Sequence, residues 1–180
     1  MVVTDDAAIA ERCRSLRNLF FQPHKRFVHE ELGWNFRMTN LQAALGLAQL
    51  ERLDEFVTRK RAMGKKYTEL LSDLEGVSLP LDESAYAQNI YWVYGLVLRD
   101  DVDFDAAEAM RRLGERRIGT RPFFWPMHEQ PVFRKIGLFD GEHYPVAERL
   151  ARRGFYIPSG MALTEQQIAS VATTVKEELR

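Results

Sequence analysis

Apolar residues recur every three or four positions between residues 39 and 76, which is the spacing of one face of a helix. Thr39 and Gln42 fit a capping box, in which each side chain satisfies a free backbone N–H of the first turn. The apolar face then comprises Leu41, Ala44, Leu45, Ala48 and Leu53, and it continues through Met63, Tyr67, Leu70, Leu71 and Leu74. Gly76 ends the pattern. We therefore predict a long connecting helical segment over residues 39–76.

Residues 1–38, before this segment, show no single hydrophobic pattern. The stretch "MVVTDD" predicts a strand, and Asp5 and Asp6 suit the positive start of a helix over residues 4–18. Residues 19–36 have no clear period and contain a proline and a glycine, so we expect a long ordered loop. A strand at the first residue needs partner strands, which the sequence does not supply. We therefore interpret residues 1–38 as the remnant of the end of a larger domain.

Strand and helix patterns alternate from residue 77 onward. Three stretches rich in aromatic and β-branched residues predict strands, namely "NIYWVYGLVLRD", "IGTRPFF" and "GFYIPSG". Helices are predicted at 103–117, at 145–152 behind Pro145, and from Thr164, which forms a second capping box with Gln167. The predicted fold class is α/β, with residues 77–180 as a small C-terminal domain that has a short three-stranded sheet and covering helices.

The composition narrows the classes of partner. The formal net charge is -1, whereas proteins that bind nucleic acids or membrane surfaces usually carry a basic excess, so we expect neither partner. The single cysteine excludes an internal disulfide and suits a reducing compartment. No apolar run approaches the length of a membrane span, and we see no signal-peptide pattern. We expect a cytoplasmic protein.

Asn35, Arg37 and Thr39 precede the well-capped helix as a polar cluster. An amide, a guanidinium and the free N–H groups of a helix start suit a phosphate in both charge and geometry. The alternative is a surface turn in front of an ordinary capped helix. Sequence physics alone leaves both interpretations open.

The stretch "TRPFFWPMH", residues 120–128, is a second candidate site. It places three consecutive aromatic residues, Phe123, Phe124 and Trp125, between two prolines, where burying all three in a loop is difficult. Such rings can stack on a nucleobase or a sugar, with Arg121 and His128 as polar contacts. The alternative is a loop that fills a core or an interface.

The other sequence patterns do not indicate a functional site. His24, His29 and Glu30 match no established metal-ligand spacing, and we predict no metal site. The basic run "RKRAMGKK" is more typical of a solvated helix face than of a nucleic-acid site. The sequence contains no phosphate-binding glycine loop, nucleophile elbow or paired-cysteine zinc motif.

Four stretches together resemble one enzyme family. "GWNFRMTNLQAALGLAQLERL", "YWVYGLVL", "GTRPFFWPMH" and "YIPSGMALTEQQI" occur in the order and spacing of the DegT/DnrJ/EryC1/StrS sugar aminotransferases, and they are most similar to the perosamine synthase branch. The resemblance covers essentially all 180 residues. It implies a C-terminal part of a fold-type-I, pyridoxal-phosphate-dependent enzyme. Such an enzyme works as a homodimer and transfers an amino group to a 4-keto-6-deoxy sugar carried on a nucleotide.

The resemblance also implies roles for individual residues. Asn35 matches the asparagine that reaches across the dimer to the cofactor phosphate, with Arg37 beside it. His128, and with it Phe123, Phe124 and Trp125, would lie near the sugar nucleotide, and Arg121 is a further candidate there. No catalytic residue is assigned.

The departure from the family pattern concerns the catalytic lysine. In the family the Schiff-base lysine lies upstream of a "GGMVVTDD"-like stretch, whereas this sequence begins at "MVVTDD". The six lysines present, Lys25, Lys60, Lys65, Lys66, Lys135 and Lys176, all stand in other contexts. Since arginine and histidine cannot form the required imine, the resemblance implies that this chain alone neither binds the cofactor nor transaminates. Three interpretations stay open: a chain completed by a large-domain partner, a non-catalytic sugar-nucleotide-binding or protein-interaction module, and a fragment without a function of its own.

Overall fold

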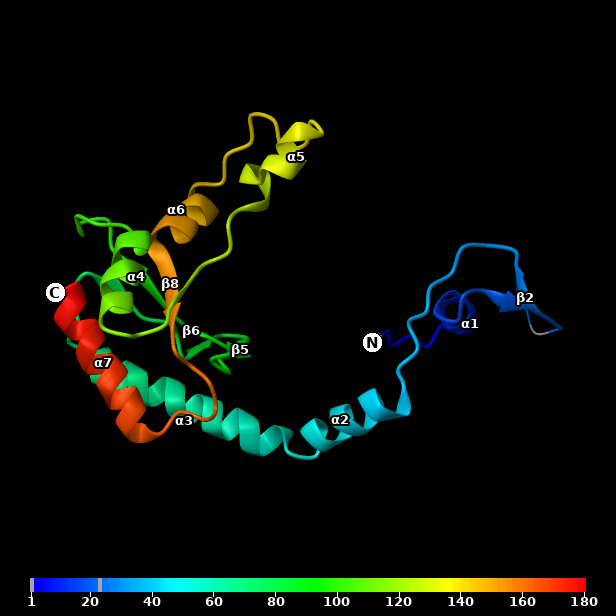
Figure 1. Ribbon diagram of the computed structural model, residues 1–180, viewed down its shortest axis with the longest axis horizontal. Helices are drawn as coiled ribbons and strands as arrows, with labels where there is room; N and C mark the ends of the chain where they lie inside the picture. Colours follow the sequence, from blue (N-terminus) through cyan, green and yellow to red (C-terminus); the bar gives the residue numbers. More distant parts are fainter. Residues whose placement is uncertain (1, 23) are drawn as a thin grey trace. The chain divides into compact units, whose positions relative to one another are not determined.

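Two units are distinguished in the computed structural model, which describes residues 2–22 and 24–180. Unit 1 is Met1–Leu53 and unit 2 is Asp54–Arg180, and each is described by itself. Unit 1 holds α1 (Ala7–Leu16), β1 (Phe21–Gln22), β2 (Lys25–His29) and α2 (Asn40–Leu50) (Figure 1). The boundary between the units falls inside the predicted connecting segment. The division into 1–38, 39–76 and 77–180 stays a prediction.

Residues 2–6 do not form the predicted strand. Asp6 instead caps α1, where its carboxylate accepts hydrogen bonds from the N–H groups of Ala8 at 2.8 Å and Ile9 at 3.1 Å. The N–H of Asp6 donates to the hydroxyl of Thr4 at 3.1 Å. These local bonds lead the chain into the helix, and within the described chain no strand pairs with this stretch. Met1, the first residue of the predicted strand, lies outside the described residues.

Part of the predicted loop 19–36 is a β-hairpin. β1 pairs antiparallel with β2, with Phe21 opposite His29. The ring of Phe21 lies edge-on to Phe27, 5.7 Å between centroids, and 5.0 Å from the ring of His29. Aromatic contacts across the two strands therefore accompany the hairpin, and they join positions that show no period along the sequence. Pro23, which supported the loop prediction, lies outside the described residues.

The predicted long helix is two helices. α2 ends at its C-cap Glu51, a turn follows, and α3 (Leu53–Leu71) begins two residues later. Acidic residues in the first turn of α3 stabilise this second helix start, because the N-terminal end of a helix is positive. The capping box of α2 is confirmed: Thr39 Oγ1 accepts from the N–H of Gln42 at 3.3 Å, and Gln42 Oε1 accepts from the N–H of Thr39 at 2.9 Å.

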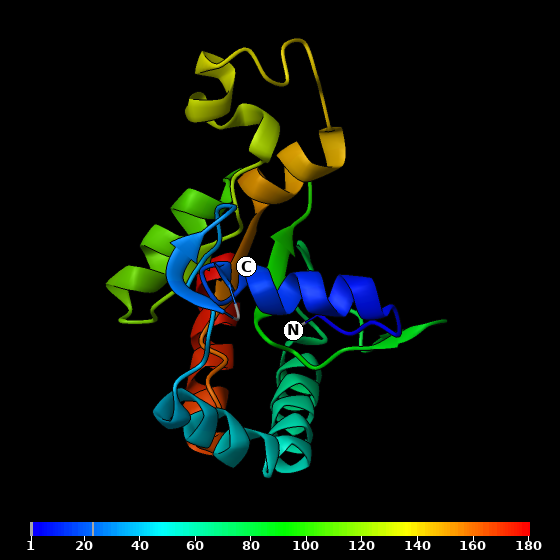
Figure 2. The same cartoon turned by 90° about the vertical axis from the view of Figure 1, so that its right-hand side faces the viewer.

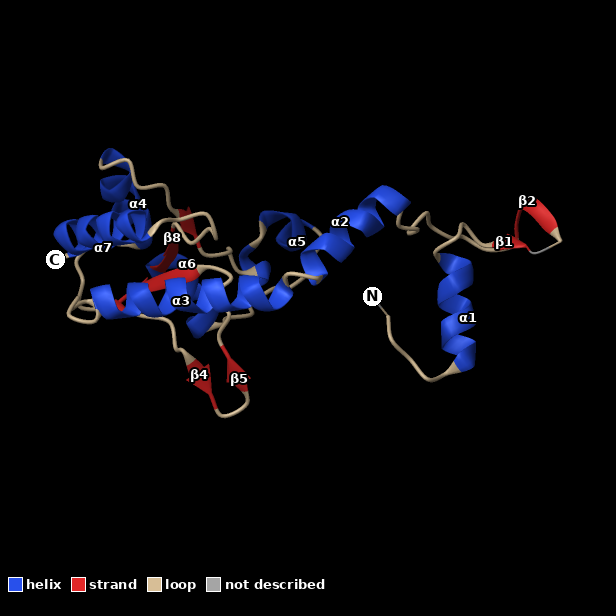
Figure 3. Ribbon diagram, turned by 90° about the horizontal axis from the view of Figure 1, so that it is seen from below, coloured by secondary structure: helices blue, strands red, loops and turns tan. Residues whose placement is uncertain are grey.

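Unit 2 contains a four-stranded antiparallel sheet in the order β3–β6–β8–β7. The strands are β3 (Val77–Ser78), β6 (Tyr94–Leu98), β8 (Gly154–Ile157) and β7 (Arg121–Pro122). The three predicted strands are confirmed as β6, β7 and β8. β3 adds a fourth strand to the predicted three, and its two residues are too few to show an alternation. A separate hairpin joins β4 (Glu83–Ser84) to β5 (Ala87–Gln88) (Figure 3).

Three predicted helices of unit 2 are confirmed as α4 (Ala106–Glu115), α6 (Pro145–Arg153) and α7 (Glu165–Leu179). The stretch between β7 and α6 also holds a 3-10 turn, η1 (Met127–Glu129), and α5 (Pro131–Lys135), which the sequence did not indicate. α7 lies alongside α3 (Figures 1 and 2), and Lys176 Nζ donates to the carbonyl oxygen of Leu70 at 3.0 Å. On α4, hydrogen bonds from Arg111 and then Arg112 lower the pKa of Glu108 to about 2.

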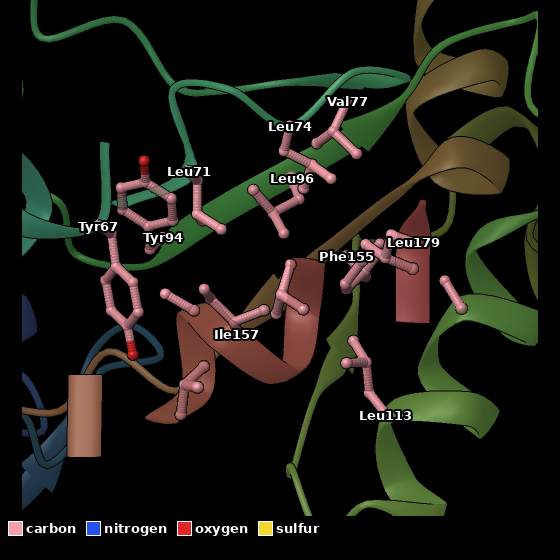
Figure 4. Close-up of a cluster of buried hydrophobic side chains, with 14 of the residues drawn as sticks. Tyr67, Leu71, Leu74, Val77, Tyr94, Leu96, Leu113, Phe155, Ile157 and Leu179 are labelled. Carbon is pink, nitrogen blue, oxygen red and sulfur yellow. The ribbon is translucent and has the colours of Figure 1, made fainter. Parts of the chain in front are cut away.

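The hydrophobic core of unit 2 lies between α3, α4, α7 and one face of the sheet (Figure 4). Alternate residues of β6 point into it, and Phe155 and Ile157 of β8 are fully buried beside them. Two tyrosines bring polar atoms into this core. Tyr67 donates its hydroxyl hydrogen to the carbonyl oxygen of Pro158 at 2.8 Å, and the hydroxyls of Tyr94 and Thr68 are hydrogen-bonded at 2.8 Å. Burial raises the pKa of Tyr94 to about 12.

The start of α3 ties two loops of unit 2 together. Lys60 donates to the carbonyl oxygens of Trp92 and Ser159, and burial lowers the pKa of its ammonium group. Arg59 donates to the carbonyl oxygen of Met161 at 2.8 Å. Both residues belong to the basic run predicted as a solvated face. Arg59 is exposed, as predicted, whereas Lys60 is partly buried and donates to two backbone carbonyls, so the prediction is wrong for Lys60.

Candidate functional site

The cluster of Asn35 and Arg37 lies on an exposed segment that runs beside the end of α1. Asn35 forms an isolated antiparallel bridge with Asn18, and the N–H of Phe36 donates to the carbonyl oxygen of Arg17 at 3.0 Å. Arg37 donates to Asn18 Oδ1 at 3.1 Å. This bond holds the guanidinium at Asn18, beyond the end of α1. Along the sequence the segment presents an amide, a cation and the start of α2 within a few residues.

The surroundings of this cluster are apolar and exposed. Trp34 and Phe36 stack with 6.1 Å between ring centroids, and both rings face solvent. α2 has no buried residue in this chain, and its exposed apolar side chains are Leu41, Leu45, Leu47 and Leu50. A helix with such a surface is typical of an interface with another polypeptide.

The aromatic stretch 120–128 forms one wall of a pocket in unit 2. The pocket has a volume of ≈ 830 Å³. Four predicted site residues line it, Arg121, Phe123, Phe124 and Trp125, together with Asp105, Ala106, Ala107, Met110, Pro122, Ala151, Arg152 and Tyr156. The aromatic rings and the guanidiniums offer stacking surfaces and positive charge in one place.

The three aromatic residues differ in exposure. Phe123 is half-buried because its ring packs directly on Gly95 and Gly154, where a Cβ would come within 3 Å of ring atoms. Phe124 is 79% exposed and Trp125 is 47% exposed. Phe123 therefore anchors the segment to the sheet, while the other two rings are accessible to a ligand.

His128 is not among the residues that line this pocket. It is 4% exposed, its Nε2 lies 2.9 Å from Glu148 Oε1, and its ring meets Tyr144 edge-on at 4.9 Å between centroids. The structure thus brings four of the five predicted substrate-site residues together, whereas the fifth, His128, is buried against Glu148 and Tyr144 instead. In this arrangement His128 connects η1 to the first turn of α6.

Arg152 is the site residue that sequence reasoning missed. Its guanidinium lies over the Trp125 ring at 4.9 Å, and it donates to Glu129 Oε1 at 2.8 Å and to the carbonyl oxygen of Glu148 at 3.1 Å. These contacts raise the pKa of Arg152, first through the hydrogen bond to Glu129. The spacing of Glu148 and Arg152 on one helix was visible in the sequence, but their approach to Trp125 and Glu129 depends on tertiary structure.

Glu148 is held in its charged form. The backbone N–H of Tyr144 donates to Glu148 Oε1 at 2.9 Å, and the imidazole of His128 shares the same oxygen. The first of these hydrogen bonds, and then the second, lower the pKa of Glu148. The carboxylate therefore accepts from two different segments and holds them at the start of α6.

A pyridoxal cofactor is anchored covalently by a lysine amine, so the environment of each lysine shows whether this chain offers such an anchor. Lys60 donates to backbone carbonyls, while Lys65, Lys66 and Lys176 pair with Asp82, Glu69 and Asp73, respectively. Lys25 and Lys135 are exposed on the hairpin and on α5. Asn35 and Arg37 fit a contact to the cofactor phosphate, but none of these lysine environments fits the covalent anchor. We derive no catalytic step through the cofactor.

The sequence model of the DegT/DnrJ/EryC1/StrS aminotransferase family matches residues 1–176. GDP-perosamine synthase of Escherichia coli O157:H7 is 32% identical over 177 residues, which are 98% of this chain and 46% of that protein. The aminotransferase TlmJ from Streptoalloteichus hindustanus has a TM-score of 0.82 at 27% identity, over 97% of this chain and 46% of that one. DesI, solved in the presence of its TDP-sugar product, has a TM-score of 0.78 at 29% identity, over 97% of this chain and 44% of that one.

The chain thus spans about half the length of the curated relatives it matches. The part described here is similar to the C-terminal part of these aminotransferases, as the sequence resemblance implied. Among the described residues, no helix has the length and apolar character needed to span a membrane.

Proposed function

Since this chain belongs to the DegT/DnrJ/EryC1/StrS aminotransferase family, we propose that it supplies the C-terminal part of a pyridoxal-phosphate-dependent nucleotide-sugar aminotransferase. The substrate class is a 4-keto-6-deoxy sugar on a nucleotide. The observation that carries the proposal is the aromatic pocket of unit 2, because it combines exposed rings with Arg121 and Arg152. Rings of this kind stack on a base or a sugar, and guanidiniums bind the diphosphate.

Unit 1 would contribute to the cofactor rather than to the sugar. Asn35 and Arg37 stand before a capped helix, where an amide and a cation suit the cofactor phosphate. The covalent anchor must come from elsewhere, because the six lysines of these 180 residues are engaged with other groups or exposed on the surface. We therefore propose that these residues alone are not catalytically competent and do not hold the cofactor.

We also propose that the chain is a homodimer through α2. Leu41, Leu45 and Leu50 are each more than 60% exposed, and burying such side chains against a second copy would be strongly favourable. A cytoplasmic location would suit an enzyme of nucleotide-sugar metabolism. Neither a nucleic acid nor a membrane is proposed as a partner.

The alternative function is that of a non-catalytic module, which binds a sugar nucleotide or a protein and acts with a full-length relative or a large-domain partner. The exposed apolar face of α2 favours it, because such a face suits an interface with another polypeptide. The two functions predict different results when the chain is mixed with the separately produced large domain of a relative. Activity that appears only in the mixture supports the enzyme, whereas binding without turnover supports the module.

The pocket is tested by titrating the chain with GDP-perosamine, the compound in the relative's name, and with GDP alone. We expect the chain to bind the sugar nucleotide. Trp125→Ala and Phe124→Ala should each weaken this binding about 5- to 150-fold, since stacking on one ring contributes about 1–3 kcal/mol. Tyr86→Ala is the matched control, because Tyr86 is 92% exposed on the β4–β5 hairpin and lines no described pocket. An equal loss in the control, or no binding at all, would contradict the pocket assignment.

A further inference from the structure

Three potential metal ligands meet between η1 and α6. The ligand atoms of His128, Glu129 and Glu148 all lie within 4.8 Å of one another. His128 and Glu129 are adjacent in η1, and Glu148 lies in the first turn of α6. The fold therefore brings together residues that are about twenty positions apart in the sequence. None of these three residues lines the aromatic pocket.

One oxygen of this cluster has no partner in the described chain. Glu129 Oε1 accepts a hydrogen bond from Arg152, but Oε2 of the same carboxylate is buried and accepts none. A buried carboxylate oxygen loses its hydration and therefore needs a compensating donor or cation. The Glu129 side chain is 13% exposed, and the neighbouring His128 side chain is 5% exposed, so the group that compensates must be small.

The charge of the cluster favours a cation. Glu129 and Glu148 are two carboxylates; Arg152 forms an ion pair with Glu129, whereas its contact to Glu148 is with the backbone carbonyl oxygen. The backbone N–H of Tyr144 and the imidazole of His128 both lie 2.9 Å from Glu148 Oε1, so this carboxylate is held in place beside His128. The exposed imidazole of His143 has its Nδ1 3.7 Å from Glu148 Oε1.

The structure assigns His128, Glu129 and Glu148 as a binding site for a divalent zinc-type ion, with water as the fourth ligand. One imidazole and two carboxylates suit zinc, whereas magnesium and calcium prefer oxygen ligands alone. Zinc holds nitrogen and oxygen at about 2.0–2.2 Å, which puts tetrahedral ligand atoms roughly 3.4 Å apart. For the ion to enter, the 2.9 Å between His128 Nε2 and Glu148 Oε1 has to open and their shared proton has to leave, while the wider separations, which are at most 4.8 Å, have to close.

The bonds around the three ligands suit this role. Arg152 orients the Glu129 carboxylate and Tyr144 orients that of Glu148, as outer partners do in established metal sites. An ion at this position would clamp η1 to α6. It would thereby fix the segment that carries Trp125 and the pocket wall. The inference goes beyond the proposed function and does not depend on it.

Zinc binding to the full chain tests the site, by calorimetry and by mass spectrometry under native conditions. We expect one zinc ion per chain, no magnesium binding, and an affinity at least tenfold lower in Glu129→Gln and in Glu148→Gln. Glu142→Gln is the matched control, because this exposed carboxylate lies in the same segment and hydrogen-bonds to the Tyr144 hydroxyl instead. The double variant His24→Ala/His29→Ala should bind zinc as the wild type does.

Because a glutamine variant that misfolds would also lose zinc, a second measurement uses only the wild-type chain. Zinc added to the isotope-labelled wild-type chain should first shift the amide resonances of residues 127–130 and 145–149. The inference is overturned if no stoichiometric zinc binds, if both glutamine variants retain it, if the double histidine variant loses it, or if the first shifts fall in residues 24–30.

Discussion

Two glycines hold Phe123 against the sheet, and their substitution by alanine should have unequal costs. A Cβ built on Gly154 would lie 2.3 Å from Phe123 Cδ2 and 2.5 Å from the backbone oxygen of Leu150. A Cβ built on Gly95 would meet only the end of the same ring, at 2.8 Å from Cζ. Both contacts are shorter than Cβ atoms tolerate, but only the first involves backbone.

The magnitudes follow from what has to move. We expect Gly154→Ala to lower the free energy of unfolding by about 2–3 kcal/mol, because the end of α6 must shift. Gly95→Ala should cost about 1 kcal/mol, since a ring edge can move. Gly114→Ala is the matched control in α4: a Cβ there meets nothing within 4 Å, and alanine should raise the stability by about 0.5 kcal/mol.

Urea unfolding followed by far-UV circular dichroism measures these differences. Combining each glycine variant with Phe123→Leu separates the ring contact from the backbone contact. In that background the cost of Gly95→Ala should vanish, while Gly154→Ala should keep at least half of its cost because Leu150 remains in place. The reasoning is refuted if Phe123→Leu removes the whole cost of Gly154→Ala, or if the two glycine variants are equally stable.

Three further predictions concern charge, burial and assembly. Hydrogen bonds from Arg111 and then Arg112 lower the pKa of Glu108 from 4.5 to about 2, so its contribution to stability is present above pH 4.5 and is lost as the pH falls toward 2. Urea unfolding at graded pH measures this loss. Glu108→Gln should make the loss smaller, whereas Glu75→Gln, at an exposed position, should leave it unchanged. Lys60→Met should lower the free energy of unfolding by about 1–3 kcal/mol, measured by the same unfolding assay, because it removes a partly buried donor from two carbonyl oxygens. Leu45→Glu should convert a sedimenting dimer into a monomer, because it places a charge on the exposed apolar face of α2; a dimer that persists in Leu45→Glu contradicts assembly through α2.

Local signals in the sequence predicted where α2, α6 and α7 begin, but not the turn that separates α2 from α3. The capping boxes at Thr39 and Thr164 and the proline at the start of α6 each act within one turn, so they can be identified without tertiary contacts. The hairpin of β1 and β2 and the two-residue β3 could not be predicted, because short strands are defined by their pairing. The strand predicted at residues 2–6 was wrong because side-chain capping competes with extended structure there.

In the candidate site, too, local sequence indicated some features, whereas others depend on tertiary contacts. The aromatic run indicated that its three rings would be hard to bury completely, and in the structure Phe124 and Trp125 are exposed and line one pocket with Arg121. Their role in binding a ligand stays a prediction. The partners of His128 and Trp125 lie some twenty residues later, on α6, and only the fold brings them together. Burial of His128 therefore could not be inferred from the loop that contains it.

The central claim is that these 180 residues contribute to a cofactor and sugar-nucleotide site without supplying the covalent anchor. Adding pyridoxal phosphate, reducing with borohydride, and mapping the adducts by intact mass and peptide analysis tests this most directly. We predict only scattered, substoichiometric labelling of the six lysines and no discrete absorbance band of a specific adduct. One stoichiometric adduct at a single lysine, with its own absorbance band, would contradict the claim.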